Sequence, residues 1–187
     1  MFIAINLERE VKQYLANIQE YIVNFKEAQL KMKSVEYLNL HISLKFLGEL
    51  NTLQIEKTIL ALRKISFQYQ PFTIELSKKI GVFPNPDKPR IIWIGVEKGY
   101  VGVEEIYHTI KQELGNESFY SYDKKFTTHI TLGRVKYLKY PDMLIDFLKS
   151  IQFKNISQTI HSIELMESNL TPKGPVYTVI SSFPLLQ

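Results

Sequence analysis

Two short stretches of the sequence repeat one pattern: HISLKFLG at residues 41–48 and HITLGR at residues 129–134. Each begins with histidine and continues with an apolar residue, a hydroxyl residue and leucine. The chain has four histidines, and the other two, His108 and His161, are followed two residues later by isoleucine instead of a hydroxyl residue. The pairing of an imidazole with a hydroxyl is therefore specific to two positions, one in each half of the chain.

Both stretches are predicted to be strands, in which residues two apart point to the same face of a sheet. His41 is therefore expected beside Ser43, and His129 beside Thr131. The isoleucine and leucine of each stretch point the other way, into an apolar core. Each strand is then held by packing on one face and presents an imidazole and a hydroxyl on the other, which is a rigid support for a reaction site.

Outward from these strands, the hydrophobic periodicity predicts an alternation of helices and strands. Apolar residues at three- and four-residue steps predict the first helix, Asn51 or Thr52 is expected to cap the second, and Pro141 to begin the last. The predicted helices are residues 8–27, 52–65, 103–114 (with Gly115 as its stop) and 141–151. The predicted strands are residues 1–7, 31–37, 40–50, 71–79, 91–97, 126–135, 159–167 and 176–183, with Lys173 in the turn before the last.

The order of these elements predicts the fold class. Several strands alternate in the manner of antiparallel sheets that bury one face. A helix followed by a strand-rich segment with His-x-Ser/Thr occurs once in each half, which indicates two similar lobes. No linker-like stretch divides the chain, so we expect an α+β fold in a single domain, residues 1–187.

The composition excludes several classes of protein. The chain has 187 residues, of which 45% are hydrophobic and 22% charged, as in ordinary globular proteins. It has no cysteine, which excludes disulfides, thiolate nucleophiles and cysteine-based zinc sites. No apolar run approaches the ~18 to 20 residues of a membrane span, and the start of the chain does not resemble a signal peptide. The net charge of +4 permits an anionic partner without requiring one. We expect a cytoplasmic monomer.

Two imidazoles that face one cleft suit acid–base chemistry, because one neutral ring can accept a proton while one charged ring donates another. The neighbouring hydroxyls can donate hydrogen bonds to the oxygens of a small anion. This combination fits phosphodiester cleavage without a metal or another cofactor. A single His-x-Ser/Thr is a weak signal, since a half-buried histidine often only satisfies a neighbour. Two copies, each followed by leucine, a glycine and a basic residue, favour a site.

Five further residues are weighed against ordinary structural roles. Arg134 points to the core side by strict alternation, but a bulge at the preceding glycine could bring it round to bind phosphate. Lys45 lies four residues after His41 and is therefore expected on the same face of the strand, either in the cleft or, with slight preference, in solvent. Phe46 and Trp93 are expected in the core. Tyr177 could stack on a base, although packing is the commoner role for a tyrosine in a terminal strand.

These motifs resemble those of the two-histidine (2H) phosphoesterases, and among them the RNA 2′,3′-cyclic phosphodiesterases, also called 2′-5′ RNA ligases. The resemblance runs along nearly the whole chain and rests on FIAINL (2–7), NLHISLKFLGEL (39–50), PFTIEL (71–76), GVFPNPDKPRIIWIGV (81–96), FTTHITLGR (126–134) and ESNLTPKGPVYTVISSFPL (167–185). The family usually has proline where this chain has Thr128, and more often threonine where it has Ser43. Both departures are mild, because serine keeps the hydroxyl and Thr128 lies at the entry to the strand.

The resemblance implies a bilobal α+β fold with pseudo-twofold lobes, helices outside and a central cleft. It implies hydrolysis of RNA 2′,3′-cyclic phosphate ends to 2′-phosphate ends, with His41 as proton donor, His129 as proton acceptor and Ser43, Thr131 and Arg134 as substrate-binding residues. Alternatives remain open: a phosphodiesterase acting on another small cyclic nucleotide or a 2′-5′ linkage, and a non-catalytic nucleotide- or RNA-binding module. A metal-binding protein is disfavoured, because carboxylate or thiolate neighbours are missing from the motifs.

Overall fold

The computed structural model describes residues 1–114, 126–172 and 174–186, so Gly115 and Lys173 lie outside the described residues. The described helices are α1 (Arg9–Asn24), α2 (Thr52–Ser66), α3 (Tyr100–Leu114) and α4 (Pro141–Ser150), with one 3-10 turn, η1 (Tyr37–Asn39). The described strands are β1 (Phe2–Asn6), β2 (Lys31–Ser34), β3 (His41–Phe46), β4 (Phe72–Phe83), β5 (Ile91–Lys98), β6 (His129–Tyr137), β7 (Ser157–Ile160), β8 (Ser162–Thr171) and β9 (Gly174–Pro184).

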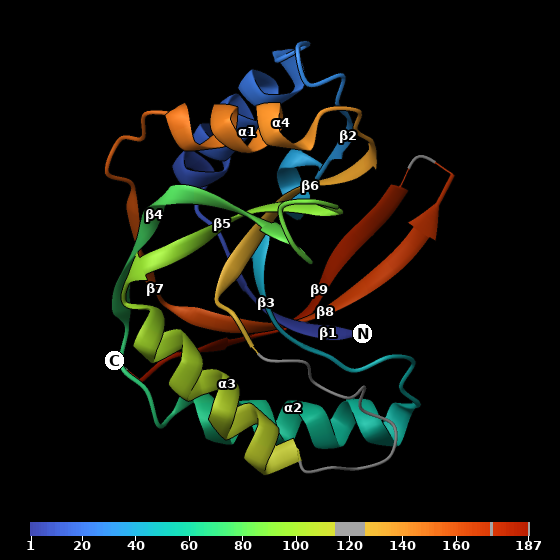
Figure 1. The fold of residues 1–187 in the computed structure, drawn as a ribbon. Coiled ribbons are helices and arrows are strands. Elements are labelled where there is room, and N and C mark those ends of the chain that lie inside the picture. Colours follow the sequence, from blue (N-terminus) through green and yellow to red (C-terminus); the bar gives the residue numbers. More distant parts are fainter. Residues whose placement is uncertain (115–125, 173, 187) are drawn as a thin grey trace.

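All nine described strands join one antiparallel sheet. Its order is β7-β4-β5-β6-β3-β1-β8-β9, and β2 adds to β6. The two motif strands, β3 and β6, are neighbours in the middle of this order, where the two halves of the chain meet. The expected lobes are therefore the two ends of a single curled sheet (Figure 1).

The helices cover the sheet in two pairs, α1 with α4 at one end of the molecule and α2 with α3 at the other (Figure 1). Helix α1 contacts β2 and β6, and α4 contacts β4, whereas α2 contacts β8 and β9, and α3 contacts β3. The apolar residues of the motif strands, among them Ile42 and Ile130, are fully buried in the core beneath these helices. The expected α+β arrangement with helices outside is confirmed.

Local signals set the boundaries of most elements. The amide of Gln54 donates to the side chain of Asn51 at 3.0 Å, and the amide of Asn51 donates back to the Gln54 side chain at 2.8 Å, so α2 begins with a capping box. Pro141 begins α4 as expected. The sequence predicted one continuous strand over residues 159–167, which was wrong. The structure has two strands there, β7 and β8, separated at His161, because β7 pairs with β4 whereas β8 pairs with β1.

Strand β3 contains a bulge that changes which side chains reach each face. Ile3 of β1 pairs with Lys45 and Ala4 pairs with Ser43, so Leu44 is an extra residue. Beyond a bulge the two faces of a strand exchange. Lys45 is therefore buried, with 4% of its surface exposed, and Phe46 is 59% exposed. Both expectations were wrong: Lys45 lies neither in the cleft nor in solvent, and Phe46 is outside the core.

Strand β6 contains a bulge at the equivalent position. Ile92 of β5 pairs with Gly133 and Trp93 pairs with Thr131, so Leu132 is the extra residue. A Cβ atom at Gly133 would come within 2.5 Å of the Met32 side chain on β2, so glycine leaves room for that side chain beside the bulge. The bulge turns the next residue, Arg134, to the face that carries the histidine and threonine.

Candidate active site

The pairing of β3 with β6 brings the two motifs together. Ile42 lies opposite Ile130 in this antiparallel pair. The register therefore sets His41 across from Thr131, and Ser43 across from His129, at the close spacing of cross-strand neighbours. The four side chains form a compact group on the face that looks away from the core.

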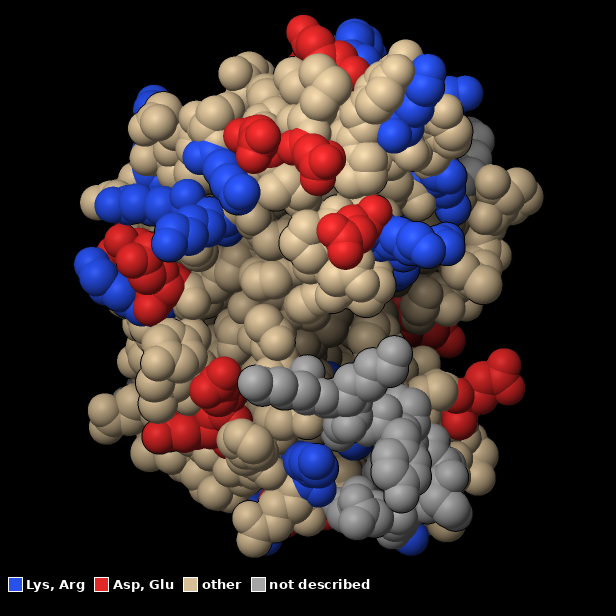
Figure 2. Space-filling model, viewed as in Figure 1, with Lys and Arg blue, Asp and Glu red and all other residues tan. Residues whose placement is uncertain are grey.

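This face forms one wall of a cleft of about 370 Å³. The residues that line it are Lys33, Ser34, Val35, Glu36, Asn39, His41, Ser43, Phe46, Ile91, His129, Thr131, Arg134, Lys136, Pro175 and Tyr177. All five site residues expected from the sequence are among them. Figure 2 shows Lys and Arg interspersed with Asp and Glu on the face it presents, so that face carries no large continuous basic surface.

Both histidine rings are held in the same orientation by the backbone. The Nδ1 atom of His41 lies 2.7 Å from the carbonyl oxygen of Asn39, and that of His129 lies 2.7 Å from the carbonyl of Thr127. A carbonyl oxygen only accepts hydrogen bonds, so each Nδ1 carries the hydrogen. Each Nε2 is then the ring nitrogen that remains available to accept or donate a proton. In His41 it lies 2.7 Å from the Ser43 Oγ atom.

The protein surroundings favour the neutral form of both rings. Burial lowers the pKa of His41 below its ordinary value, and the hydrogen bond to the Asn39 carbonyl partly opposes this. The positive charges of Lys12 and His129 lower the pKa of His41 further. Burial also lowers the pKa of His129, against the opposing bond to Thr127. An anion bound between the rings would reverse part of the effect and favour an imidazolium.

A buried charged group, Lys12, acts electrostatically on His41 and was not found from the sequence. Lys12 of α1 is 7% exposed and its Nζ donates to the Leu38 carbonyl at 2.9 Å. Burial lowers the pKa of Lys12, and Glu164 of β8 opposes this. Burial raises the pKa of Glu164, against a hydrogen bond from Asn6 and the charge of Lys12. The signal that the sequence did offer for this group was Lys12 itself, a lysine at the start of the apolar face of the helix predicted over residues 8–27.

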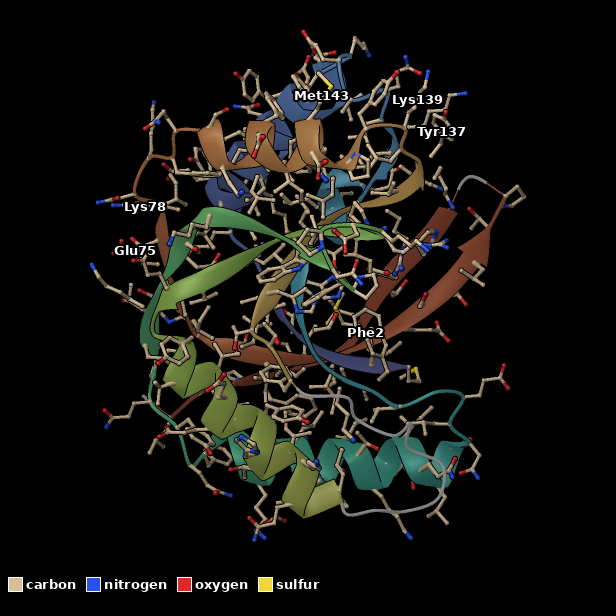
Figure 3. The ribbon with its side chains drawn as sticks, viewed as in Figure 1. Phe2, Glu75, Lys78, Tyr137, Lys139 and Met143 are labelled. Carbon is tan, nitrogen blue, oxygen red and sulfur yellow. The ribbon has the colours of Figure 1, made fainter. Side chains whose placement is uncertain are left out.

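Aromatic rings surround each histidine. Around His41, the centroid of Phe2 lies 5.1 Å away and that of Tyr177 lies 5.4 Å away, edge-on. Phe2 lies in the interior between the two helix pairs (Figure 3). Around His129, Phe83 lies at 5.2 Å and Trp93 at 5.8 Å.

Of two expectations about aromatic residues, the one for Trp93 was wrong and the one for Tyr177 is confirmed. Trp93 is not a core residue, because it shares the face of Thr131 and stacks on Phe83 at 4.8 Å. Tyr177 does pack, as expected, but its packing partners are Phe2 and His41, and it also lines the cleft. The sequence did not indicate that either ring would lie beside a catalytic candidate.

Arg134 lies on a cationic side of the cleft. It pairs in register with Lys33 of β2, and Lys136 of its own strand also lines the cleft. Its charge lowers the pKa of Tyr177, although burial of that phenol has the larger, raising effect. Glu36 is the acidic residue among the lining side chains.

Within the described ranges, no group of three or more His, Cys, Asp or Glu side chains is arranged to hold a metal ion. In the same part of the chain, no helix is both long and apolar enough to cross a membrane.

Comparison with known sequences matches this chain to a family of phosphoesterases. A sequence model of a family described as LigT like Phosphoesterase matches residues 5–93. A protein of Methanocaldococcus jannaschii named RNA 2′,3′-cyclic phosphodiesterase is 34% identical, covering 98% of this chain and 99% of its own. A protein of Thermotoga maritima with the same name is 34% identical, covering 96% of this chain and 91% of its own.

Solved structures share the fold. A crystal structure from Thermus thermophilus has a TM-score of 0.76 at 28% identity, covering 98% of this chain and 96% of its own. Escherichia coli LigT has a TM-score of 0.74 at 21% identity, covering 100% of this chain and 96% of its own, and shows the fold alone. The fold and the paired histidine strands define a two-histidine phosphoesterase. Within that class, the chain belongs to the LigT-like phosphoesterase family of these relatives.

Proposed function

We propose that the protein hydrolyses the 2′,3′-cyclic phosphate at the end of an RNA to a 2′-phosphate, by acid–base catalysis between two histidines. The observation that carries the proposal is the matched pair of imidazoles, His41 and His129, on neighbouring strands of one cleft, each with its Nδ1 bonded to the backbone. The substrate class comes from the names of relatives that match this chain over nearly their whole length.

In the proposed reaction, water attacks the cyclic phosphorus while the Nε2 atom of His129 takes its proton. The bond from phosphorus to the 3′ oxygen breaks, and the Nε2–H of His41 protonates that oxygen. The product is a ribose with a free 3′-hydroxyl and a 2′-phosphate. His41 ends neutral and His129 charged, and exchange with solvent restores the starting states.

The other site residues hold the phosphoryl group. The hydroxyls of Ser43 and Thr131 lie beside the two imidazoles and can donate to the nonbridging oxygens. Arg134 supplies a guanidinium, which suits phosphate oxygens because its donors form a planar fork. The Ser43 hydroxyl contacts His41 Nε2, so it must turn toward the substrate on binding. All these groups come from one chain, so the proposed site needs no second copy.

With a 5′-hydroxyl as the nucleophile, the same site would join that end to a cyclic phosphate as a 2′-5′ bond, and the bond from phosphorus to the 3′ oxygen would break as before. A 5′-hydroxyl would take the position of water, and His129 would remove its proton. Because water is in large excess, we expect this ligation to be weak and visible only at high concentrations of both ends.

The test is product analysis on an RNA with a 2′,3′-cyclic phosphate end, and on 2′,3′-cyclic AMP, with EDTA present. We expect the 2′-phosphate product in each case. His41→Ala and His129→Ala should each reduce kcat by about 10²- to 10⁴-fold, as expected for loss of a general acid or base. His108→Ala, an exposed histidine of α3, is the matched control. A 3′-phosphate product, or full activity of either cleft variant, would contradict the proposal.

A further inference from the structure

The ribbon formed by β2 and β6 continues beyond the cleft, and its two faces differ. Met32 and Val135 pair in register and pack against the apolar core on one face. Lys33 and Arg134 are the neighbouring pair, and they lie on the opposite face and line the cleft. By strict alternation along β6, Tyr137 would share the core face of Val135.

A second bulge in β6 places Tyr137 on the other face instead. Lys31 of β2 pairs with Tyr137, and Met32 pairs with Val135, so Lys136 is an extra residue. Because the two faces exchange beyond a bulge, Tyr137 and its partner Lys31 lie on the face that carries the cations of the cleft. The side chain of Tyr137 is accordingly 50% exposed.

This face leads out of the cleft as a path of cations with one exposed ring. Arg134 and Lys136 line the cleft, whereas Lys31 and Tyr137 lie outside its lining. At about 3.3 Å per residue, Tyr137 lies at most roughly 10 Å beyond Arg134 along the strand. Directly opposite residues have Cβ atoms about 4.5 to 5.5 Å apart, so Lys31 and Tyr137 present a cation and a ring side by side.

The charges on this path are open to an anionic ligand. Lys31 and Lys136 are exposed, and neither forms an ion pair with any described residue. Cations and rings continue to alternate past the strand, where the Nζ atom of Lys139 lies 5.0 Å from the ring centroid of Tyr140. Tyr137 and Lys139 both lie at the outer end of β6 (Figure 3).

Single-stranded RNA has the chemistry that this path would recognise. Its phosphates bind cations, and its bases stack on exposed aromatic rings without regard to sequence. A cyclic phosphate occupies the 3′ end of an RNA, so the rest of the chain leaves the cleft from the 5′ oxygen of the terminal ribose. Groups outside the cleft lining therefore meet the nucleotides that precede the terminal one.

We propose that the outer face of β2 and β6, formed by Lys31, Lys136 and Tyr137, binds the single-stranded RNA that precedes the cyclic-phosphate end. The proposal rests on the proposed function and deepens it, since an RNA chain rather than a free cyclic nucleotide is then the preferred substrate. A base upstream of the end stacks on Tyr137, and the phosphate beside it binds Lys31. Lys136 carries the chain from the cleft to this surface.

The test compares 2′,3′-cyclic AMP with a short single-stranded oligoadenylate that ends in the same nucleotide. We expect the wild type to have a higher kcat/KM on the oligoadenylate, expressed mainly in KM and decreasing with salt. Tyr137→Ala should lower kcat/KM on the oligoadenylate by about 5- to 150-fold, the range for loss of one base–aromatic stack, and leave the value on cyclic AMP unchanged. Tyr137→Phe keeps the ring and should behave as the wild type.

Lys31→Met tests the phosphate contact separately. On the oligoadenylate, it should make the slope of log kcat/KM against log salt concentration shallower by about 0.7, as expected for loss of one phosphate contact to a single strand. The matched controls are Lys57→Met and Tyr100→Ala, because both residues are exposed and lie on α2 and α3, at the other end of the molecule (Figure 1). Both controls should match the wild type on both substrates.

Three outcomes would contradict this assignment. If Tyr137→Ala lost activity equally on both substrates, its role would be structural and the proposed surface would be overturned. A wild type that hydrolyses both substrates equally well would also overturn it, with the proposed function intact. So would a preference for the oligoadenylate that survives both Tyr137→Ala and Lys31→Met, because the RNA would then leave the cleft by another path. Failure of the wild type on both substrates would refute the proposed function itself.

Discussion

At the scale of single residues, the two histidines have matched backbone contacts and different neighbours. Each Nδ1 donates to the carbonyl two residues earlier, which fixes the ring and leaves Nε2 for the proton transfer. The charge of Lys12 acts on His41, and the buried carboxyl of Glu164 lies close to that lysine. The environment therefore lowers the pKa of His41, which makes its proton easier to transfer but leaves fewer molecules with a protonated His41 in the free site.

These surroundings predict the pH dependence. The proposed reaction requires His129 neutral and His41 protonated, so kcat/KM should follow a bell whose maximum lies midway between two apparent pKa values of the pair. Both pKa values are lowered from the ordinary 6.5 by burial, so the maximum should lie below pH 6.5. Steady-state kinetics across the acid range measure this. A rate that rises steadily to about pH 9 and is lost in EDTA would indicate a metal-bound hydroxide instead.

Substitution of Lys12 tests which histidine controls which limb of the bell-shaped pH profile. Lys12→Met removes a positive charge that lowers the pKa of His41, so that pKa should rise and the limb that His41 controls should move to higher pH. The limb that His129 controls should move less. NMR titration of the two rings gives the same quantities directly. Lys26→Met is the control, because Lys26 is exposed beyond the end of α1.

At the scale of elements, the bulges on β3 and β6 decide the lining of the cleft. A regular strand would keep Arg134 on the core side with Leu132, and would leave Lys45 beside Ser43. The extra residue in each strand, Leu44 or Leu132, exchanges the two faces of the strand for the residues that follow it. The bulge of β6 is packed tightly, since Gly133 lies against the side chain of Met32.

Substitution of Gly133 tests that packing. A Cβ atom in Gly133→Ala would lie 2.5 to 2.9 Å from three atoms of Met32, so either the thioether or the strand must move. We expect the free energy of unfolding to fall by about 1 to 3 kcal/mol, as in overpacked interiors. Adding Met32→Ala should cost less than the sum of the two single changes, because the clash is gone.

Gly95→Ala on the neighbouring β5 is the matched control. A Cβ atom there would find its nearest neighbour at 3.4 Å, close to ordinary contact, so the loss should be smaller. Denaturant unfolding of the four variants measures the free energies. Strict additivity of the Gly133 and Met32 changes would show that the bulge is not held by this contact.

At the scale of the whole molecule, one sheet and one apolar core join the two ends of the fold. Strands β3 and β6 meet at the pair Ile42–Ile130, and both residues belong to a single buried cluster that includes residues from all four described helices. The catalytic candidates, His41 and His129, lie on these two strands, where the two halves of the chain meet. Their spacing therefore depends on the two halves of the chain staying in register.

This arrangement predicts that the chain unfolds as one domain. Far-UV circular dichroism, which reports all helices, and the fluorescence of Trp93, the one tryptophan of the sequence, should follow a single transition with the same midpoint. Trp93 reports from β5 beside His129. Two separated transitions would show instead that the lobes are independent domains.

The sequence by itself determined the two pairs of histidine with a hydroxyl residue, and most of the elements. The alternation of a strand is local, so His41 with Ser43, and His129 with Thr131, could be assigned to one face without knowledge of any neighbour. The capping residue of α2 and the proline of α4 are equally local signals. The resemblance to the two-histidine phosphoesterases rested on these same stretches.

Only the tertiary structure decided what surrounds the two pairs. A bulge is defined by the register with the next strand, so Lys45, Phe46 and Arg134 could not be assigned to a face from β3 or β6 alone. The break at His161 exists because β7 and β8 pair at different parts of the sheet, which no local pattern records. Lys12 reaches the site from another element, so its role depends on how helix and sheet pack together.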